Sequence, residues 1–324
     1  MTKQIVIVGA GMAGLLAAIK FPDAKVIEGS PAHVGRKQQH KALLRFRNDS
    51  VSRLTGIPFK KVNVHKAIVA PHTERDAMPM LLTECNLQLA NLYSSKVTGS
   101  LGGRSIWNLS ASERYIAPDD FFDRLISRVE RDGRAIEFDS PLGYLNPNNI
   151  YINTAPMQVM AGIAGFDLPV LPESFKANPI HVDTYQIPNC DVYQTLYFPN
   201  PQYGVYRASI TGDKLIVERI SSDEWVDQLA IHHIMNAFGL PYNSANPVYI
   251  ETNTQSFGKI VPLSKPERDA VLYRLTREYD VYSLGRFATW RNILLDDVAK
   301  DVEVIHKLIS ASEYQRSMFV NVPM

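Results

Sequence analysis

Three glycines near the start of the chain have the spacing that a nucleotide diphosphate requires. Gly9, Gly11 and Gly14 form the pattern GxGxxG. The first glycine allows a tight turn, the second lets the backbone approach a pyrophosphate, and the third lets a helix and a strand pack closely. Glu28, nineteen residues after Gly9, is placed to accept hydrogen bonds from ribose hydroxyls, and an acid there argues against NADP. The motif therefore predicts dinucleotide binding.

The residues around these glycines predict the elements that position them. Gln4 to Val8 has the β-branched richness of a buried parallel strand, Met12 to Lys20 has a helical pattern, and Lys25 to Glu28 reads as a second strand. A strand, a glycine turn, a helix and a strand thus follow within thirty residues. At the helix start, Met12 and Ala13 are predicted to border the cofactor together with the glycines, because a helix N-terminus attracts phosphate.

The residues after Glu28 favour FAD over NAD. Six residues separate Glu28 from Gly35-Arg36, and this arrangement resembles the acid, five-residue spacer and Gly-Gly-Arg of the flavoprotein superfamily that contains amine oxidases, protoporphyrinogen oxidase and UDP-galactopyranose mutase. Val34 replaces the first glycine of that pair. The resemblance implies FAD as the cofactor, with Arg36 at its diphosphate through a charge-assisted hydrogen bond.

Two further stretches resemble the same superfamily. Ile152 to Pro156 is similar to the return strand of its FAD-binding domain, and Leu284 to Trp290 is similar to the segment that meets the FAD before the last helix. The resemblance implies that Gly285 and Arg286 border the cofactor. It also implies that the backbone around Ile293 and Leu294, at the N-terminus of the last helix, faces the flavin pyrimidine ring. A helix N-terminus there stabilises negative charge on the flavin.

The predicted fold class is α/β: a Rossmann-like FAD-binding domain with a second α+β substrate domain built on an antiparallel sheet. Aromatic and β-branched runs at Tyr193 to Phe198, Val205 to Ile210 and Leu215 to Arg219 predict that sheet. We expect the FAD-binding domain to comprise three segments, at 1–72, 113–160 and 257–324. The substrate side would comprise a helical or loop segment at 73–112 and the substrate domain at 161–256.

Three residues are candidates for catalysis. Alternation along the strand places Tyr206 and Arg207 on opposite faces, so only one of them can point at the substrate. An inward Arg207 would clamp a carboxylate or phosphate, whereas an inward Tyr206 would form an aromatic wall suited to an amine. Lys259 follows the substrate domain, and amine oxidases of the superfamily use a lysine near the flavin N5 atom, held through water.

Charge is distributed unevenly along the chain. The formal net charge of 324 residues is only +1, which argues against a general polyanion-binding protein. Residues 36–66, however, hold nine Lys and Arg against one acid, Asp49, so this segment is about +8 and the rest of the chain about −7. We name residues 36–66 the basic segment. Its charge predicts an anionic ligand nearby.

Other features exclude some classes of protein. Only two cysteines are present, so we do not expect a disulfide framework. We expect a reducing, cytoplasmic setting instead. Adjacent His232 and His233 cannot share a helix face, and we predict no metal site. The longest apolar stretch, Ala155 to Leu171, is too interrupted to span a membrane, so no membrane contact is expected. The sequence makes no prediction of oligomeric state.

The leading functional hypothesis is an FAD-dependent oxidoreductase that oxidises a C–N bond of an amine or amino-acid adduct, carried by a small molecule or a nucleotide. The resemblance implies hydride transfer to flavin N5 followed by imine hydrolysis. Small bacteriophage flavoproteins look similar, with a basic stretch like that at Leu43 to Arg47. Some are FAD-dependent lyases of thymidine hypermodification. That resemblance implies a DNA substrate in the host cytoplasm, with the basic segment contacting phosphates.

Two alternatives remain open. A UDP-sugar mutase would use reduced FAD without net oxidation, and the short chain and the Gly285-Arg286 ending permit it. A non-catalytic carrier, similar to the GDP-dissociation inhibitors related to this superfamily, would keep the fold without redox chemistry. Val34 in place of a glycine is the feature that favours the carrier.

Overall fold

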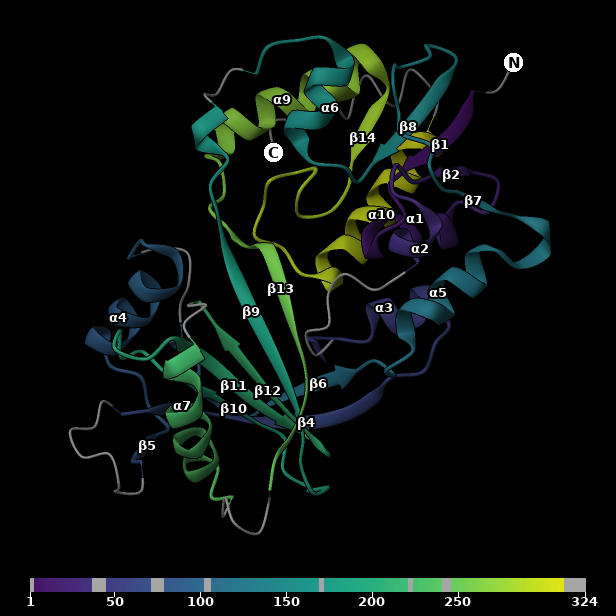
Figure 1. Cartoon of the computed structure of the whole chain (residues 1–324). Coiled ribbons are helices and arrows are strands. Elements are labelled where there is room, and N and C mark those ends of the chain that lie inside the picture. Colours follow the sequence, from purple (N-terminus) through teal and green to yellow (C-terminus); the bar gives the residue numbers. More distant parts are fainter. Residues whose placement is uncertain are drawn as a thin grey trace.

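Two sheets organise the chain. The computed structural model describes residues 3–36, 45–70, 79–101, 106–168, 172–220, 224–240 and 246–311. The smaller sheet is wholly parallel, in the order β14-β8-β1-β2-β7, and lies beside the larger sheet (Figure 1). Its strands are β1 (Gln4–Val8), β2 (Lys25–Ile27), β7 (Ile136–Glu137), β8 (Asn149–Asn153) and β14 (Val281–Ser283).

Helices cover both faces of the parallel sheet. Successive side chains of β1 point to opposite faces, so Ile7 packs in a core with Leu15 and Val302, whereas Val6 packs in another with Met157. The helices that flank this sheet or connect its strands are α1 (Met12–Lys20), α2 (Ala32–Gly35), α3 (Ser50–Thr55), α5 (Phe121–Val129), α6 (Met157–Ala164), α9 (Lys265–Tyr279) and α10 (Leu295–Ser310).

The larger sheet has nine strands and is mixed. Its order is β13-β9-β12-β11-β10-β4-β6-β3, with β5 paired to β4, and β10 and β4 form a parallel pair. These strands are β3 (Arg45–Phe46), β4 (Lys60–Val69), β5 (Leu81–Leu82), β6 (Ser112–Ile116), β9 (Ala177–Gln186), β10 (Gln194–Tyr197), β11 (Val205–Thr211), β12 (Lys214–Arg219) and β13 (Val248–Ile260).

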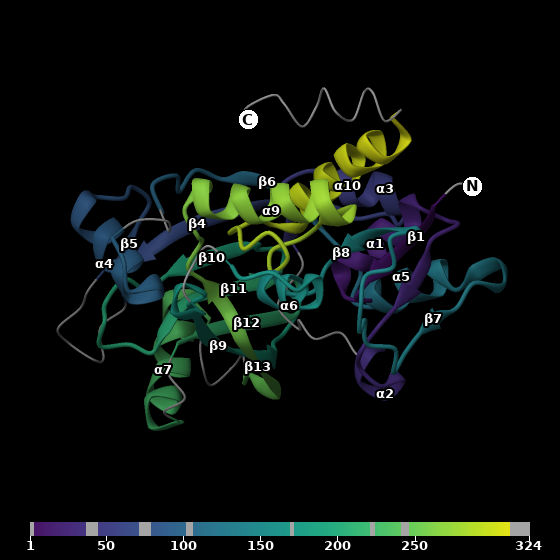
Figure 2. The same ribbon diagram turned by 90° about the horizontal axis from the view of Figure 1, so that it is seen from above.

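One helix accompanies each of the two apolar cores of the larger sheet. Tyr93 and Val97 of α4 (Leu87–Thr98) pack with Tyr206, whereas Ile234 and Met235 of α7 (Glu224–Ala237) pack in the other core. Seen from above, the parallel sheet with α1 and α5 still lies beside the larger sheet with α4 and α7 (Figure 2).

The predicted fold class is confirmed: a parallel Rossmann-like sheet is joined to a second, strand-rich unit. The return strand predicted at Ile152 to Pro156 is β8, which pairs with β1 in parallel. The second sheet contains the predicted antiparallel meander as β10, β11 and β12. Segments β4 and β6 also belong to this larger sheet. The bounds of the five predicted segments themselves stay a prediction.

Candidate functional site

The loop between β1 and α1 takes its shape from its glycines. Gly9 has a φ of +99°, and a Cβ there would lie 2.4 Å from Oγ1 of Thr154. A Cβ on Gly14 would lie 1.8 Å from the carbonyl oxygen of Gly9. By contrast, among the described residues no heavy atom lies within 4 Å of the place a Cβ on Gly11 would take. The N-terminus of α1 is therefore open to a ligand, and its unpaired N–H groups favour an anion.

Backbone N–H groups fix the carboxylate of Glu28. Its Oε2 accepts from the N–H of Ala10 at 2.8 Å, and its Oε1 accepts from the N–H of Ser30 at 2.9 Å. A carboxylate has about four acceptor positions, so both oxygens can still accept from hydroxyl groups. Glu28 thus lies beside the glycine turn in a geometry that suits a ribose.

The loop after β14 packs against the start of α1. Gly285 has a φ of +92°, and a Cβ there would lie 3.0 Å from the Cβ of Ala13. Nη2 and Nη1 of Arg286 donate to the carbonyl oxygens of Phe257 and Gly258 at 3.1 and 3.4 Å. These bonds connect the glycine turn, through the loop after β14, to strand β13 of the larger sheet.

Ile293 and Leu294 precede α10, where two carboxylates occupy the first turn. The N–H of Leu294 donates to Oδ2 of Asp297 at 3.0 Å. Asp296 is 1% exposed and accepts from the backbone N–H of Arg47 at 3.1 Å. The N-terminus of α10 is thus tied to the basic segment, and its approach to a flavin ring stays a prediction.

Arg36 is engaged by an acid rather than aimed at the glycine turn. Its Nη1 and Nη2 donate to the two carboxylate oxygens of Glu130 at 2.9 and 2.5 Å, and its guanidinium lies 5.0 Å from the centroid of the Phe138 ring. The hydrogen bond to Glu130 raises the pKa of Arg36. Its contact with a diphosphate stays a prediction, and it requires the guanidinium to turn away from Glu130.

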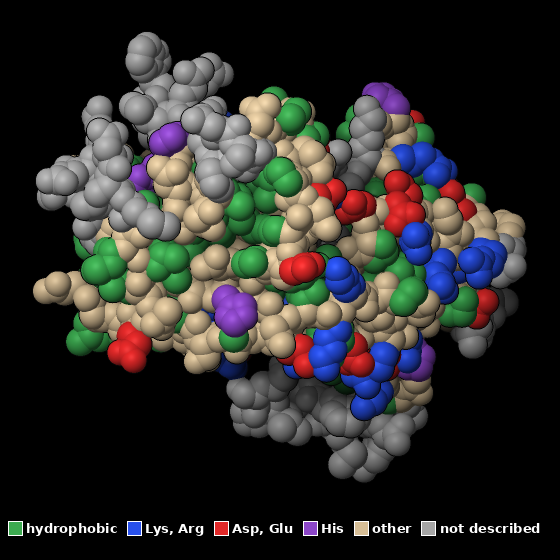
Figure 3. All heavy atoms as spheres, turned by 90° about the horizontal axis from the view of Figure 1, so that it is seen from below, with side chains coloured by type: hydrophobic (Ala, Val, Ile, Leu, Met, Phe, Trp, Pro, Cys, Tyr) green, Lys and Arg blue, Asp and Glu red, His purple; other side chains and the backbone are tan. Residues whose placement is uncertain are grey.

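Acids compensate much of the basic segment. Four of its seven described cations form ion pairs: Arg36 with Glu130, Arg47 with Asp297, Arg53 with Asp49, and Lys61 with Glu113. On the face in Figure 3, Lys and Arg side chains are interspersed with Asp and Glu. Two further cations of the segment, Lys37 and Lys41, lie outside the described residues. So do the first two residues of the Leu43 to Arg47 stretch.

A β-bulge in β11 brings two predicted site residues to one carboxylate. The pairing of β11 with β12 shifts between Val205 and Arg207, so Tyr206 is the extra residue. The hydroxyl of Tyr206 donates to Oε1 of Glu218 at 3.0 Å, Nη2 of Arg207 donates to the same oxygen at 2.6 Å, and Nε of Arg207 pairs with Oε2. The prediction that Tyr206 and Arg207 lie on opposite faces is wrong, because the bulge interrupts the alternation.

Lys259 joins these residues, and we name Tyr206, Arg207, Glu218 and Lys259 the Glu218 cluster. Nζ of Lys259 lies 5.0 Å from the centroid of the Tyr206 ring. Burial opposes ionisation of Glu218, but the charges of Arg207 and Lys259 outweigh it and lower the pKa of Glu218 to about 2. Burial alone would lower the pKa of Arg207. The charge of Glu218 outweighs burial and raises the pKa of Arg207 well above its usual value. Glu218 and Arg207 therefore stay ionised at neutral pH.

Exposure separates the roles within the cluster. Tyr206 is fully buried, so it positions Glu218 and presents no aromatic wall to a ligand. Arg207 keeps 31% of its side-chain surface, and Lys259 is half-buried. Sequence reasoning missed Glu218; the available signal was an acid directly after the apolar run Leu215 to Val217 and before Ile220.

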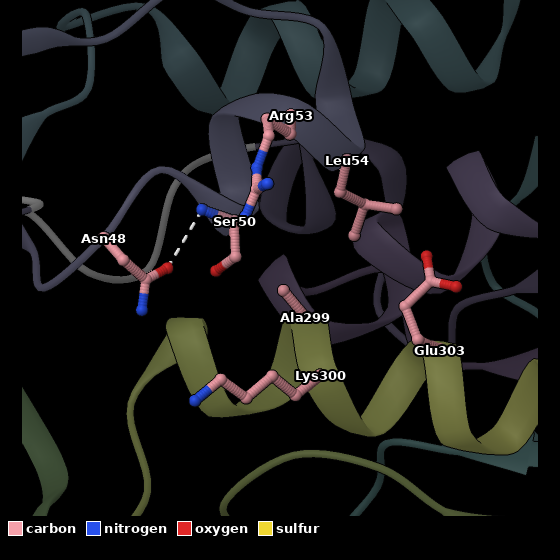
Figure 4. Close-up of a pocket in the computed structure, with 7 residues that line it drawn as sticks. All are labelled: Asn48, Ser50, Arg53, Leu54, Ala299, Lys300 and Glu303. Atoms are coloured by element: carbon pink, nitrogen blue, oxygen red, sulfur yellow. Dashed lines mark hydrogen bonds between the residues drawn. The ribbon is translucent and has the colours of Figure 1, made fainter.

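A separate pocket of about 490 Å³ lies between α3 and α10. Figure 4 shows its lining, in which the backbone N–H of Ser50 donates to Oδ1 of Asn48 at 2.9 Å. Lys300 and Arg53 stand there together with Glu303, so charges of both signs line the pocket. It contains none of the residues predicted to bind the cofactor or to act in catalysis.

Two other features bear on the expected function. Within the described parts of the chain, no group of three or more His, Cys, Asp or Glu side chains could hold a metal ion. None of the described helices combines the length and the apolar character needed to cross a membrane.

Comparison with known proteins identifies the fold. No protein-family model matches the sequence, and no curated protein matches it. Solved structures do match over nearly the whole chain. Reduced UDP-galactopyranose mutase has a TM-score of 0.64 at 14% identity, covering 99% of this chain and 97% of its own. An oxidoreductase from Methanosarcina mazei has a TM-score of 0.59 at 9% identity, covering 94% and 100%.

A third similar structure is L-proline dehydrogenase from P. horikoshii, with a TM-score of 0.51 at 12% identity, covering 95% of this chain and 93% of its own. At these identities the likeness establishes the fold alone. The chain has a fold like that of FAD-dependent oxidoreductases, in which a parallel Rossmann-like sheet is joined to a mixed sheet.

Proposed function

We propose that this protein is an FAD-dependent oxidoreductase that oxidises a C–N bond of an amine. The observation that carries the proposal is the junction at Arg286, which ties the loop packed on the glycine turn to β13 beside Lys259. A dinucleotide at the turn and a substrate on the larger sheet would then meet at Lys259. The fold shared with L-proline dehydrogenase, whose name describes oxidation of a cyclic amine, supports this class of reaction.

The residues at the glycine turn fit FAD. The open space at Gly11 admits a pyrophosphate, and Glu28 retains acceptor positions for ribose hydroxyls. Gly285 and Arg286 would border the cofactor from the other side. FAD, when bound, supplies a two-electron acceptor for the hydride of the carbon next to nitrogen.

The Glu218 cluster would orient the substrate and water. Because Glu218 and Arg207 keep their charges at neutral pH, neither exchanges protons during turnover. Lys259 is the remaining cation of the cluster, and we assign its Nζ to orienting the water that hydrolyses the imine. Tyr206 and Glu218 would fix that ammonium by the cation–π contact and by charge.

The first test is the visible absorption spectrum of the purified protein, followed by acid release and identification of the chromophore. We expect FAD, and we expect an amine or an amino acid to bleach its band without oxygen. Lys259→Met should lower the rate at which the hydrolysed carbonyl product forms after bleaching by at least about 100-fold, with the FAD content unchanged. Lys265→Met, at an exposed ion pair with Asp269, is the matched control. A colourless protein that takes up no FAD would overturn the proposal.

A UDP-sugar mutase is the second candidate, and the TM-score of 0.64 to reduced UDP-galactopyranose mutase favours it. Titration of the reduced protein with UDP-galactose separates the two. Binding without any bleaching by amines would favour the mutase, and absence of binding would remove it. The third candidate, a non-catalytic carrier, would be supported only if the purified protein held no flavin.

The thymidine-hypermodification lyase, which would act on DNA, is a finer version of the same proposal. It requires the basic segment to contact phosphate, although four of the described cations there already have acidic partners. DNA contact through this segment therefore stays a prediction.

A further inference from the structure

Arg45 carries a buried donor that the fold leaves unused. The residue lies on β3, and its Nη2 donates to Oγ1 of Thr195 at 2.9 Å. Its Nη1 has no exposed surface and, among the residues that the structure describes, no hydrogen-bond partner. A buried N–H of a charged group without an acceptor is strongly unfavourable, so a ligand that supplies an acceptor would be bound there.

Among the residues that the structure describes, no carboxylate forms an ion pair with Arg45. Burial and the nearby charge of Arg207 lower its pKa to about 10, Arg114 acts in the same direction, and Glu218 and Tyr197 act against them. The acceptors of Glu218 are already engaged by Arg207 and Tyr206. Arg207 and Lys259 lower the pKa of Glu218, and Glu218 in turn acts on Arg45, so the three cations interact electrostatically with this carboxylate.

The hydroxyl of Thr195 does not depend on Arg45 for a hydrogen-bond partner. Its Oγ1 lies 3.0 Å from Oγ of Ser209, so the hydroxyl keeps a partner when Arg45 is absent. Ser209 and Arg207 lie two residues apart on β11, which places Arg45 at the edge of the Glu218 cluster.

We infer that Arg45, with Arg207 beside it, binds an anionic group of the substrate, a carboxylate or a phosphate. Nη1 of Arg45 supplies the free donor, and a bidentate guanidinium contact suits either anion. This inference rests on the proposed function for the identity of the substrate as an amine, and it adds that the amine carries the anionic group.

The test measures the melting temperature of the protein, with whatever cofactor it retains, in sodium acetate, sodium phosphate and sodium chloride at equal ionic strength. Acetate or phosphate should raise the melting temperature above that in chloride, by about 2 °C at ten times the dissociation constant. Arg45→Met should abolish this rise while melting no lower than the wild type in chloride. Arg45→Lys should retain a weaker rise, since it keeps the charge and loses the fork.

Arg124→Met is the matched control, because Arg124 forms an exposed ion pair with Asp120 on α5. It should retain the full rise. An equal rise in the wild type and Arg45→Met would overturn the inference, as would a wild type that gains nothing from either anion. A rise in melting temperature with acetate would identify the anionic group of the substrate as a carboxylate, and a rise with phosphate would identify it as a phosphate.

A second measurement uses turnover. For an amine that carries the effective anion, Arg45→Met should raise KM by about 10- to 100-fold, and for the matching amine without it KM should not change. Equal effects on both amines would overturn the inference. Should no amine bleach the flavin while the anion still raises the melting temperature through Arg45, the proposed function fails and the anion site stands.

Discussion

Nζ of Lys96 donates to the carbonyl oxygen of Val205 at 2.6 Å, directly before the bulge that brings Tyr206 and Arg207 onto one face. The same ammonium donates to the carbonyl oxygens of Phe198 and Asn200 at 2.7 and 2.8 Å. Three acceptors match the three N–H groups of a protonated lysine. Lys96 of α4 therefore holds the backbone that shapes the Glu218 cluster.

The stability contributed by Lys96 should depend on pH. Burial lowers the pKa of Lys96 from 10.5 to about 7. The unfolded chain therefore binds more protons than the folded protein between those pH values, and the contribution of Lys96 to the free energy of unfolding rises with pH. We expect the wild type to gain stability over Lys96→Met from pH 6 to pH 9, by at most about 1.4 kcal/mol per pH unit.

Urea unfolding of both proteins at several pH values measures this difference. Lys265→Met, at an exposed site, should show no such slope. A constant difference between the wild type and Lys96→Met would mean that the three carbonyl groups keep the ammonium charged throughout.

Substitution of two glycines of the turn by alanine should change different properties: the stability of the protein at Gly14 and the affinity for FAD at Gly11. Gly14→Ala places a Cβ 1.8 Å from a backbone oxygen, so the apoprotein should lose stability. Gly11→Ala enters open space with an ordinary φ of −70°, so the apoprotein should melt normally. That methyl group nevertheless occupies the predicted place of the pyrophosphate, and FAD affinity should fall at least about 10-fold. Melting and FAD titration distinguish the two, and Gly11→Ala with unchanged affinity would place the diphosphate elsewhere.

Glu218→Gln should destabilise the protein by about 3 kcal/mol at pH 7, because it leaves the charge of Arg207 without its partner. The pKa of Glu218 is lowered to about 2 in the folded state. Its stabilising contribution is therefore present above the usual carboxyl range and is lost as the pH falls towards 2.

The difference between the wild type and Glu218→Gln should accordingly fall to less than about half by pH 3. Urea unfolding at pH 7, 5 and 3 measures it. Glu137→Gln, at an exposed pair with Lys25, is the control and should change stability by less than about 1 kcal/mol. A penalty for Glu218→Gln that is the same at all three pH values would contradict the ion-pair account.

The parts of the fold that were predictable are those set by local pattern. The strand at Gln4 to Val8 and the helix at Met12 to Lys20 have the predicted bounds, because alternation, helical period and glycine spacing act over a few residues. The last helix was predictable for the same reason: Leu295, Val298 and Val302 share one face at helical spacing.

The site was less predictable, because its contacts join distant residues. Arg36 meets Glu130 across 94 positions, and no local pattern signals that pairing. The bulge at Tyr206 depends on the pairing with β12, and Lys96, 109 positions before Val205 in the chain, holds its backbone. Sequence alone assumed strict alternation, which a single inserted residue overturns.

Contact between the basic segment and DNA makes a prediction about salt. Lys60 and Lys61 open β4, where Lys60 donates to the hydroxyl of Tyr193 and Lys61 pairs with Glu113, both at 2.6 Å. If these lysines leave those partners for two phosphates, the double change Lys60→Glu and Lys61→Glu should reduce the slope of log affinity against log salt concentration by about 2. Fluorescence anisotropy with a labelled duplex at several salt concentrations measures the slope.

The matched control for that experiment changes Lys20 and Lys25 to Glu. Like the test lysines, both have side-chain partners, since they form ion pairs with Glu303 and Glu137. The control has the same net charge as the test variant, so a smaller slope only in the Lys60 and Lys61 variant assigns the phosphate contact to the start of β4. Equal slopes in the wild type and both variants would show that the basic segment serves the fold through its acidic partners, and would remove DNA as the substrate.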